Sequence, residues 1–258
     1  MVIHVECPQS FIVCSECEKA AWDNGWRVKR GDTEGWILRE SHDAPSQIGL
    51  AAAGPDGPWF LAIDHGGVAQ ELGTAIDLAG PGLARFSFET ASDLYQAVSR
   101  AYDLAKALPD DPLHRFRAKT RTLPKSTEAE RLVVARVGQD IFRDALVRFW
   151  RGSCPLTGIT DRELLRASHM KAWATCESDE ERLDAYNGLL LSALWDAAFD
   201  RHLVTFDEDG WPKYSPLLSE SARARLEAEV TVPIKLSDRH FPYLFHHREN
   251  FHKMASGS

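Results

Sequence analysis

The first part of the chain alternates short apolar runs with turn residues, a pattern typical of a small domain with one sheet and a few helices. Apolar runs predict strands in WILRES, QIGLAAA, WFLAIDH and ARFSFET, and GPDGP predicts the turn between the second and third. SECEKAAWDNGW predicts a short helix that ends at Asn24-Gly25. Further on, apolar residues recur at steps of three and four, which predicts an amphipathic helix with one buried stripe: Leu94, Val98, Ala101, Ala105 and Leu108.

A second series of elements follows in the other half of the chain. STEAERLVVARVGQDIFRDALVRFW predicts a long helix that Ser126 or Thr127 caps, with acidic residues in its first turn, where the helix dipole favours them. LLRASHMKAW predicts a strand with His169 near its end, NGLLLSA predicts a turn and a second short strand, and LWDAAFDRH predicts a helix. LVTFDEDGWPKY predicts a hairpin that turns at Asp209-Gly210.

Composition and length narrow the class of protein. The chain has 258 residues, 44% of them hydrophobic and 26% charged, as in ordinary soluble proteins. We expect an α+β protein with a small α+β domain at residues 1–110, a basic linker at 111–125 and a second domain at 126–258. No apolar run reaches the roughly eighteen residues that a membrane span needs, and the N-terminus lacks a signal-peptide pattern. We therefore expect a cytoplasmic protein with no membrane partner.

The charge is unevenly distributed. The net charge is −8, yet HRFRAKTRTLPK contains no acidic residue and five basic ones: Arg115, Arg117, Lys119, Arg121 and Lys125. A short basic run is typical of a solvated linker, and the alternative is a segment that contacts phosphate groups. Because binding depends on the local patch, the net charge does not exclude a nucleic-acid partner.

One group of residues in the second half of the chain has side chains suited to catalysis. A histidine at the end of one strand is followed by an Asn-Gly turn, a second strand and a helix with Asp196 and Asp200 four residues apart, on one helix face. Alone, such a histidine is typical of a hydrogen-bonded core position, and such a carboxylate pair of a solvated helix. Together they supply what phosphodiester hydrolysis needs, which is a base that works near neutral pH and hard oxygen ligands for a divalent cation.

This half, from about Ser126 to Phe251, resembles the HNH endonuclease family, in the subgroup common among bacterial restriction-type nucleases. The resemblance rests on ARVGQDIFRDALVRFW, CPLTG, LLRASHMKAW, NGLLLSALWDAAFDRHLVTFDEDG and YLFHHRENF, in that order. It implies a ββα-metal nuclease domain in which His169 is the general base and Asn187 fixes the loop. It also implies that Asp196 stands at the family's final His position and that Asp200, one helical turn on, helps to bind Mg²⁺ or Mn²⁺.

The resemblance also predicts double-stranded DNA as the partner. We expect it to contact the basic linker, through Arg115, Arg117, Lys119 and Arg121, and two residues beside the base, Arg166 and Lys171. One such site cuts one strand, so we expect a homodimer. Ser168 departs from the family, because many members have a metal ligand immediately before the base. Two alternatives stay open, a non-catalytic DNA-binding or regulatory protein that retains the fold and a nonspecific toxin nuclease.

The cysteines and tryptophans of the chain raise two further possibilities, a structural zinc site and a binding site for a DNA base. CSEC places Cys14 and Cys17 at zinc-ligand spacing, with His4 and Cys7 as further candidate ligands, but both cysteines open a predicted helix, and we expect no structural zinc there. At Cys154 we expect a buried thiol. Four tryptophans lie in the first sixty residues: Trp22, Trp26, Trp36 and Trp59. They are typical of a core, or they line a cage for a flipped or modified base. The N-terminal domain is thus a candidate for DNA reading or dimerisation.

Overall fold

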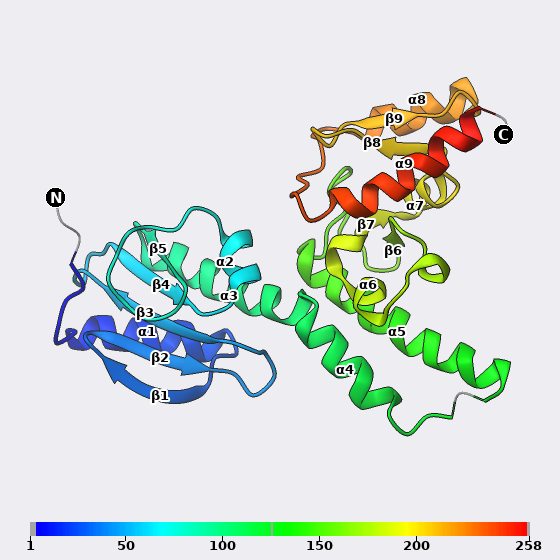
Figure 1. Cartoon of the computed structure of the whole chain (residues 1–258). Helices are drawn as coiled ribbons and strands as arrows, with labels where there is room; N and C mark the ends of the chain where they lie inside the picture. The colour runs from blue at the N-terminus through cyan, green and yellow to red at the C-terminus, as the bar shows by residue number, and fades with distance from the viewer. Residues whose placement is uncertain (1–3, 125, 257–258) are drawn as a thin grey trace. The chain divides into compact units, whose positions relative to one another are not determined.

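The computed structural model describes residues 4–124 and 126–256 (Figure 1). The chain separates into two compact units, Met1–Asp111 and Pro112–Ser258. Helices and antiparallel sheets are present in the expected α+β combination. No helix within the described residues has the length and apolarity needed to cross a bilayer. Lys125, one of the five cations of the basic run, lies outside the described residues.

The first unit is built on a five-stranded antiparallel sheet in which neighbours in sequence are neighbours in space (Figure 1). Its strands are β1 (Val28–Thr33), β2 (Trp36–Glu40), β3 (Gln47–Ala52), β4 (Trp59–Ile63) and β5 (Ala84–Phe88). The four predicted strands are confirmed. The sequence did not reveal β1, because this edge strand is polar and mostly exposed. It joins β2 through Glu34 and Gly35, both at positive φ, as a two-residue hairpin turn requires.

Helices α1 (Phe11–Asp23), α2 (Gly66–Leu72) and α3 (Ala91–Ala107) complete this unit. Both α1 and α3 contact the sheet and each other. The five apolar residues of the predicted stripe on α3 are all buried, which confirms the spacing argument. Cys14 and Cys17 lie in α1 as expected, and burial raises the pKa of the Cys17 thiol to about 12, so the thiol stays protonated at neutral pH.

The tryptophans of the first unit are mainly core residues. Trp26, Trp36 and Trp59 are 0%, 1% and 3% exposed, whereas Trp22 is 60% exposed. The indole of Trp26 donates to the carbonyl of Val98, 3.2 Å away. The aromatic cage that the sequence left open is therefore not available from three of these four rings, since packing already covers them.

Helix α4 (Asp110–Thr120) begins at the end of the first unit and lies mostly in the second. Helix α5 (Glu128–Phe149) follows it in the second unit. The segment expected to be a basic linker is thus mostly helical, because Phe116 and Thr120 are buried and tie α4 to a core. The predicted cap of α5 is confirmed at Thr127, whose hydroxyl accepts from the backbone of Glu130 while the Glu130 carboxylate accepts from Thr127 in return.

Two short strands and a helix follow in the predicted order. They are β6 (Leu165–His169), β7 (Gly188–Ser192) and α7 (Ala193–Asp200), and the loop between the strands contains η1 (Trp173–Thr175), α6 (Asp179–Leu183) and η2 (Ala185–Asn187). The antiparallel pairing places His169 opposite Gly188. All five residues of β7 are buried, and β7 contacts α5.

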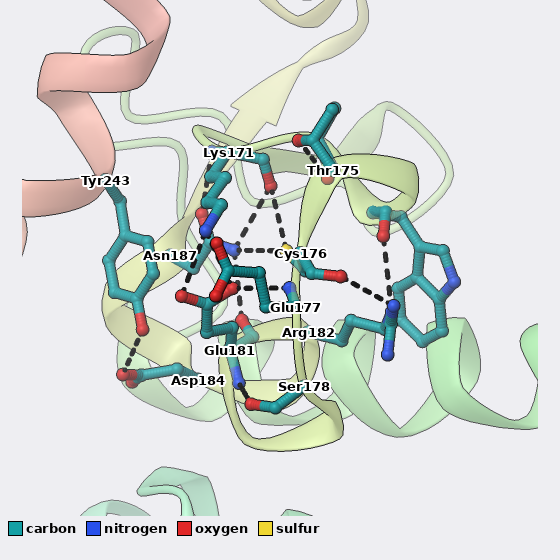
Figure 2. A network of polar contacts seen from close by, with 12 residues as sticks. Lys171, Thr175, Cys176, Glu177, Ser178, Glu181, Arg182, Asp184, Asn187 and Tyr243 are labelled. Atoms are coloured by element: carbon teal, nitrogen blue, oxygen red, sulfur yellow. Dashed lines mark hydrogen bonds and ion pairs between the residues drawn. The ribbon is translucent and has the colours of Figure 1, made fainter.

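The remaining elements are β8 (Val204–Phe206), β9 (Pro212–Tyr214), α8 (Glu220–Glu229) and α9 (Phe241–Ala255). The hairpin β8–β9 was predicted and is confirmed. Helix α9 contacts β8 and the loop between β6 and β7. Its Tyr243 hydroxyl donates to Asp184 Oδ2, 3.0 Å away (Figure 2). His240, which precedes the helix, is buried among the rings of Phe149, Trp150 and Tyr186.

Gly188 allows α5 to approach β7 closely. A Cβ at this position would lie 2.5 Å from Phe142 Cζ and 2.7 Å from Leu146 Cδ1. We predict that Gly188→Ala lowers the free energy of unfolding by about 1–3 kcal/mol, because the added methyl overpacks this contact. Urea unfolding measures the effect, and Gly54→Ala is the control, since a Cβ at Gly54 meets nothing within 4 Å. Equal stability of the two variants would contradict the packing argument.

Burial lowers the pKa of His240 from 6.5 to about 4. Between these values the unfolded chain takes up a proton that the folded chain does not. The contribution of His240 to the free energy of unfolding is therefore most favourable above pH 6.5. The folded state loses this stability as the pH falls from 6.5 towards 4. We predict that His240→Asn, which keeps an acceptor for the backbone N–H of Ser237, reduces the loss of stability between pH 7.5 and 4.5 by roughly 1–3 kcal/mol.

The measurement is urea unfolding of the whole chain at both pH values. His252→Asn is the matched control, because His252 is an exposed histidine of α9. An unchanged pH dependence in His240→Asn would show that the buried ring does not titrate in this window.

Candidate active site

The candidate site is formed by β6, β7, α7 and the loop that joins the two strands. His169 ends β6, Asn187 immediately precedes β7, and α7 contacts both strands. Residues that are far apart in sequence are therefore brought to one small region of the second unit. Strand pairing fixes the first two, because the backbone of Met170 donates to the carbonyl of Asn187 directly beyond the last strand pair, 2.9 Å away.

The imidazole of His169 has a fixed hydrogen-bond partner. Its Nε2 lies 2.9 Å from the backbone carbonyl oxygen of Arg182. Because a carbonyl only accepts, Nε2 carries the proton of the neutral ring, and Nδ1 keeps a lone pair. The ring stacks on Phe142, with 3.7 Å between centroids, and meets the edge of Trp173 at 5.7 Å.

Burial sets the charge of this ring. It lowers the pKa of His169 from 6.5 to about 4, and the contact with the Arg182 carbonyl opposes this only in part. The imidazole is therefore neutral at pH 7 and able to accept a proton. A buried imidazole of this kind is a weaker base than a free histidine, but it is unprotonated at neutral pH.

Asn187 ties together the two sides of the loop. Its side chain is 0% exposed. Its Oδ1 accepts from the backbone N–H of Lys171 at 2.8 Å, and its Nδ2 donates to the carbonyl of Glu181 at 3.0 Å and to that of Lys171 at 3.2 Å (Figure 2). The Cys176 sulfur lies 3.4 Å from the same nitrogen. These contacts are those of a side chain that holds a loop in place.

The two carboxylates of α7 lie close enough to affect each other. Partial burial, and then repulsion by Asp196, raises the pKa of Asp200 to about 6, while Arg201 opposes the shift. The hydroxyl of Ser168 donates to Asp196 Oδ1 at 2.6 Å. Ser168, which precedes His169, is thus brought to the carboxylate on the helix. No pattern in the sequence predicts this contact.

The oxygen donors fit a hydrated hard cation. Mg²⁺ keeps several water ligands and needs only one or two carboxylates, whereas structural Zn²⁺ takes four protein ligands. Within residues 4–124 and 126–256, no group of three or more His, Cys, Asp or Glu side chains converges to hold an ion. Asp196 and Asp200 therefore suit an ion that is held partly by water, and their mutual repulsion is the reason that a cation would be favourable there.

The residues predicted to contact DNA lie in two places, in or just after β6 and in or just after α4. The first group contains Arg166 and Lys171. Lys171 is largely buried, and its Nζ lies 3.0 and 2.8 Å from the two carboxylate oxygens of Glu181. The expected contact of Lys171 with phosphate stays a prediction, and in the structure the ammonium group is paired with Glu181. Arg166 is exposed on β6, and its Nη1 donates to the carbonyls of Glu163 and Leu165.

The basic residues of α4 and beyond are mostly at the surface. Arg115 pairs with Asp144 at 3.3 Å and Arg117 with Glu180 at 2.6 Å. Lys119 and Arg121 are exposed. Arg117 and Glu180 are more than half exposed, so water and salt weaken their attraction. The pair nevertheless brings Arg117 to α6, which belongs to the loop of the candidate site.

Part of the chain that contains the candidate site matches a known protein family. A family model described as HNH endonuclease matches residues 154–207, which contain β6, β7, α7 and β8. No curated protein matches the chain. Nucleases of this family bind nucleic acid and generally use divalent metals. The resemblance found from the motifs is confirmed over residues 154–207, and this part of the C-terminal half is similar to HNH endonuclease domains.

Proposed function

We propose that the chain is a metal-dependent DNA endonuclease of restriction type, with His169 as its general base. The observation that carries this proposal is the state of the His169 ring, which is neutral, donates from Nε2 to the Arg182 carbonyl and keeps its lone pair on Nδ1. A base must be unprotonated and aimed before the reaction begins. Burial supports the first condition, and the hydrogen bond to the Arg182 carbonyl supports the second because it fixes the ring.

In the proposed reaction, Nδ1 of His169 takes a proton from a water molecule. The oxygen of that water forms a bond to phosphorus as the bond from phosphorus to a deoxyribose oxygen breaks. Asp196 and Asp200 would hold a divalent cation, Mg²⁺ or Mn²⁺, which would supply Lewis-acid chemistry to offset charge on the phosphate and the leaving oxygen. Asn187 keeps the loop in place so that the ring retains its direction, and Ser168 orients Asp196 through its hydroxyl.

The DNA contacts in this proposal come from cations that are wholly or partly exposed. They are Arg166 on β6 and the basic residues of α4 and the turn after it: Arg115, Arg117, Lys119 and Arg121. Cutting both strands requires two such sites, which supports a homodimer. The separate N-terminal α+β unit, residues 1–110 in the proposed division, supports a role in DNA reading or dimerisation. A cytoplasmic location belongs to the same proposal.

A second candidate function is a DNA-binding protein that retains the HNH fold without cutting. It is favoured by one observation, that no group of three or more metal-ligating side chains converges among the described residues. The two functions differ in a plasmid assay with Mg²⁺ or Mn²⁺. An endonuclease nicks or linearises the plasmid, whereas the alternative retards it on a gel and leaves it intact.

We predict that His169→Ala lowers the rate of metal-dependent plasmid cleavage by about 10²–10⁴-fold, the usual contribution of a general base. The rate is measured from the loss of supercoiled DNA, with circular dichroism to establish that the variant is folded. His252→Ala serves as the matched control, because His252 is exposed on α9. Full activity in folded His169→Ala would exclude this residue as the base.

We also predict that Asp196→Asn and Asp200→Asn each weaken Mn²⁺ binding by about tenfold or more, because each removes one hard, charged ligand. Titration calorimetry with Mn²⁺ measures this without any reliance on cleavage. Asp161→Asn is the control, an exposed acidic residue that precedes β6. Unchanged Mn²⁺ affinity in both α7 variants would place the cation elsewhere.

A further inference from the structure

The loop between β6 and β7 is held by a second polar residue besides Asn187. The guanidinium of Arg182 donates from Nη2 to the carbonyl of Cys176 at 2.6 Å and from Nε to the carbonyl of Trp173 at 3.2 Å. Its Nη1 lies 3.0 Å from Asp179 Oδ1. Figure 2 shows Arg182 reaching across the loop to Cys176. One side chain therefore connects three parts of the loop that contains it.

Arg182 acts on the His169 ring directly through its backbone carbonyl and indirectly through Trp173. Its backbone carbonyl accepts the Nε2 proton at 2.9 Å. Its guanidinium holds the backbone of Trp173 and lies 5.9 Å from the centre of the indole. That indole meets the imidazole edge-on. The stack of the His169 ring on Phe142 of α5 does not involve Arg182.

A partly buried ion pair supports the backbone next to Arg182. Glu181 binds the ammonium of Lys171 through both carboxylate oxygens, and it also accepts from the backbone N–H of Glu177 at 2.8 Å (Figure 2). The backbone carbonyl of Glu181 accepts a hydrogen bond from Asn187 Nδ2. The peptide unit between Glu181 and Arg182 is thus fixed on one side by this pair and on the other by the Arg182 side chain.

We propose that Arg182 is a positioning residue for the His169 base, acting through its guanidinium, and that the Lys171–Glu181 pair supports it. This inference rests on the proposed function. When the guanidinium is absent, the Trp173 carbonyl and the Cys176 carbonyl lose their donor, and the segment that presents the Arg182 carbonyl is no longer fixed. The imidazole then adopts other orientations or the other neutral tautomer, in which Nδ1 carries the proton and has no lone pair to offer.

The test compares Arg182→Met and Arg182→Lys with Arg225→Met, an exposed arginine of α8. We expect Arg182→Met to lower kcat for duplex cleavage by about 10- to 100-fold, since a small misplacement of a reacting group costs about that much. We expect KM to change less than about threefold, because Arg182 is a positioning residue rather than a DNA contact. Arg182→Lys remains impaired as well, because an ammonium cannot reach both carbonyls in the planar geometry of a guanidinium.

A spectroscopic readout separates positioning from general loss of structure. Nitrogen-15 spectra of the full chain, with the His169 signal assigned from His169→Ala, report which ring nitrogen carries the proton. Wild type and Arg225→Met should show the Nε2–H tautomer, and Arg182→Met a mixture. If Arg182→Met does not fold, Arg182→Lys and Glu181→Gln provide the same comparison.

The outcomes distinguish this inference from the proposed function. Wild-type rates and an unchanged Nε2–H tautomer in folded Arg182 variants overturn the positioning role, even when His169→Ala is inactive. If wild-type protein cuts no DNA with either metal, the proposed endonuclease fails. The tautomer comparison then still decides whether Arg182 orients the ring.

Discussion

The hydrogen bond from His169 Nε2 to the carbonyl of Arg182 is the interaction on which the candidate site depends. A buried imidazole needs a partner for its proton, because an unpaired polar group in an apolar environment costs free energy. The carbonyl satisfies one nitrogen and thereby leaves the lone pair on the other. One backbone contact thus decides the tautomer, and burial between Phe142 and Trp173 decides the charge.

The rest of the domain keeps this contact in place. Gly188 lets α5 approach β7, so that Phe142 can form one wall of the histidine site. Asn187 holds the two sides of the loop at its closed end, and Arg182 and the Lys171–Glu181 pair hold its middle. On α7, Asp196 and Asp200 repel each other, which favours binding of a positive ion. In the proposed function, the apolar packing thus supports the His169 base, and the partly exposed helix α7 supplies the carboxylates for a cation.

Patterns of apolar residues predicted most of the elements. The stripe on α3, the cap of α5 and the strand–strand–helix order around His169 were all visible, because each depends on local periodicity or on a cap residue at a fixed offset. Strand β1 was missed because an edge strand with exposed polar residues has no such periodicity. Helix α4 was read as a linker, since its charges obscure the two buried positions, Phe116 and Thr120.

The side chains of the site were less predictable than its backbone. Lys171 was expected to meet phosphate, but whether a lysine is exposed or paired depends on a glutamate ten residues away, which only the fold brings near. The part played by Arg182 depends on its carbonyl, and no sequence pattern encodes which carbonyl a loop will present. The contact between Ser168 and Asp196 likewise appears only when β6 and α7 have packed together.

The most direct test of the account is a nitrogen-15 titration of the His169 ring in the intact protein. The account predicts a neutral ring with its proton on Nε2 at pH 7, and protonation only as the pH falls towards about 4. A ring that is already charged at pH 7, or one that carries its proton on Nδ1, would contradict the account, because neither form can accept a proton from water at the nitrogen assigned here.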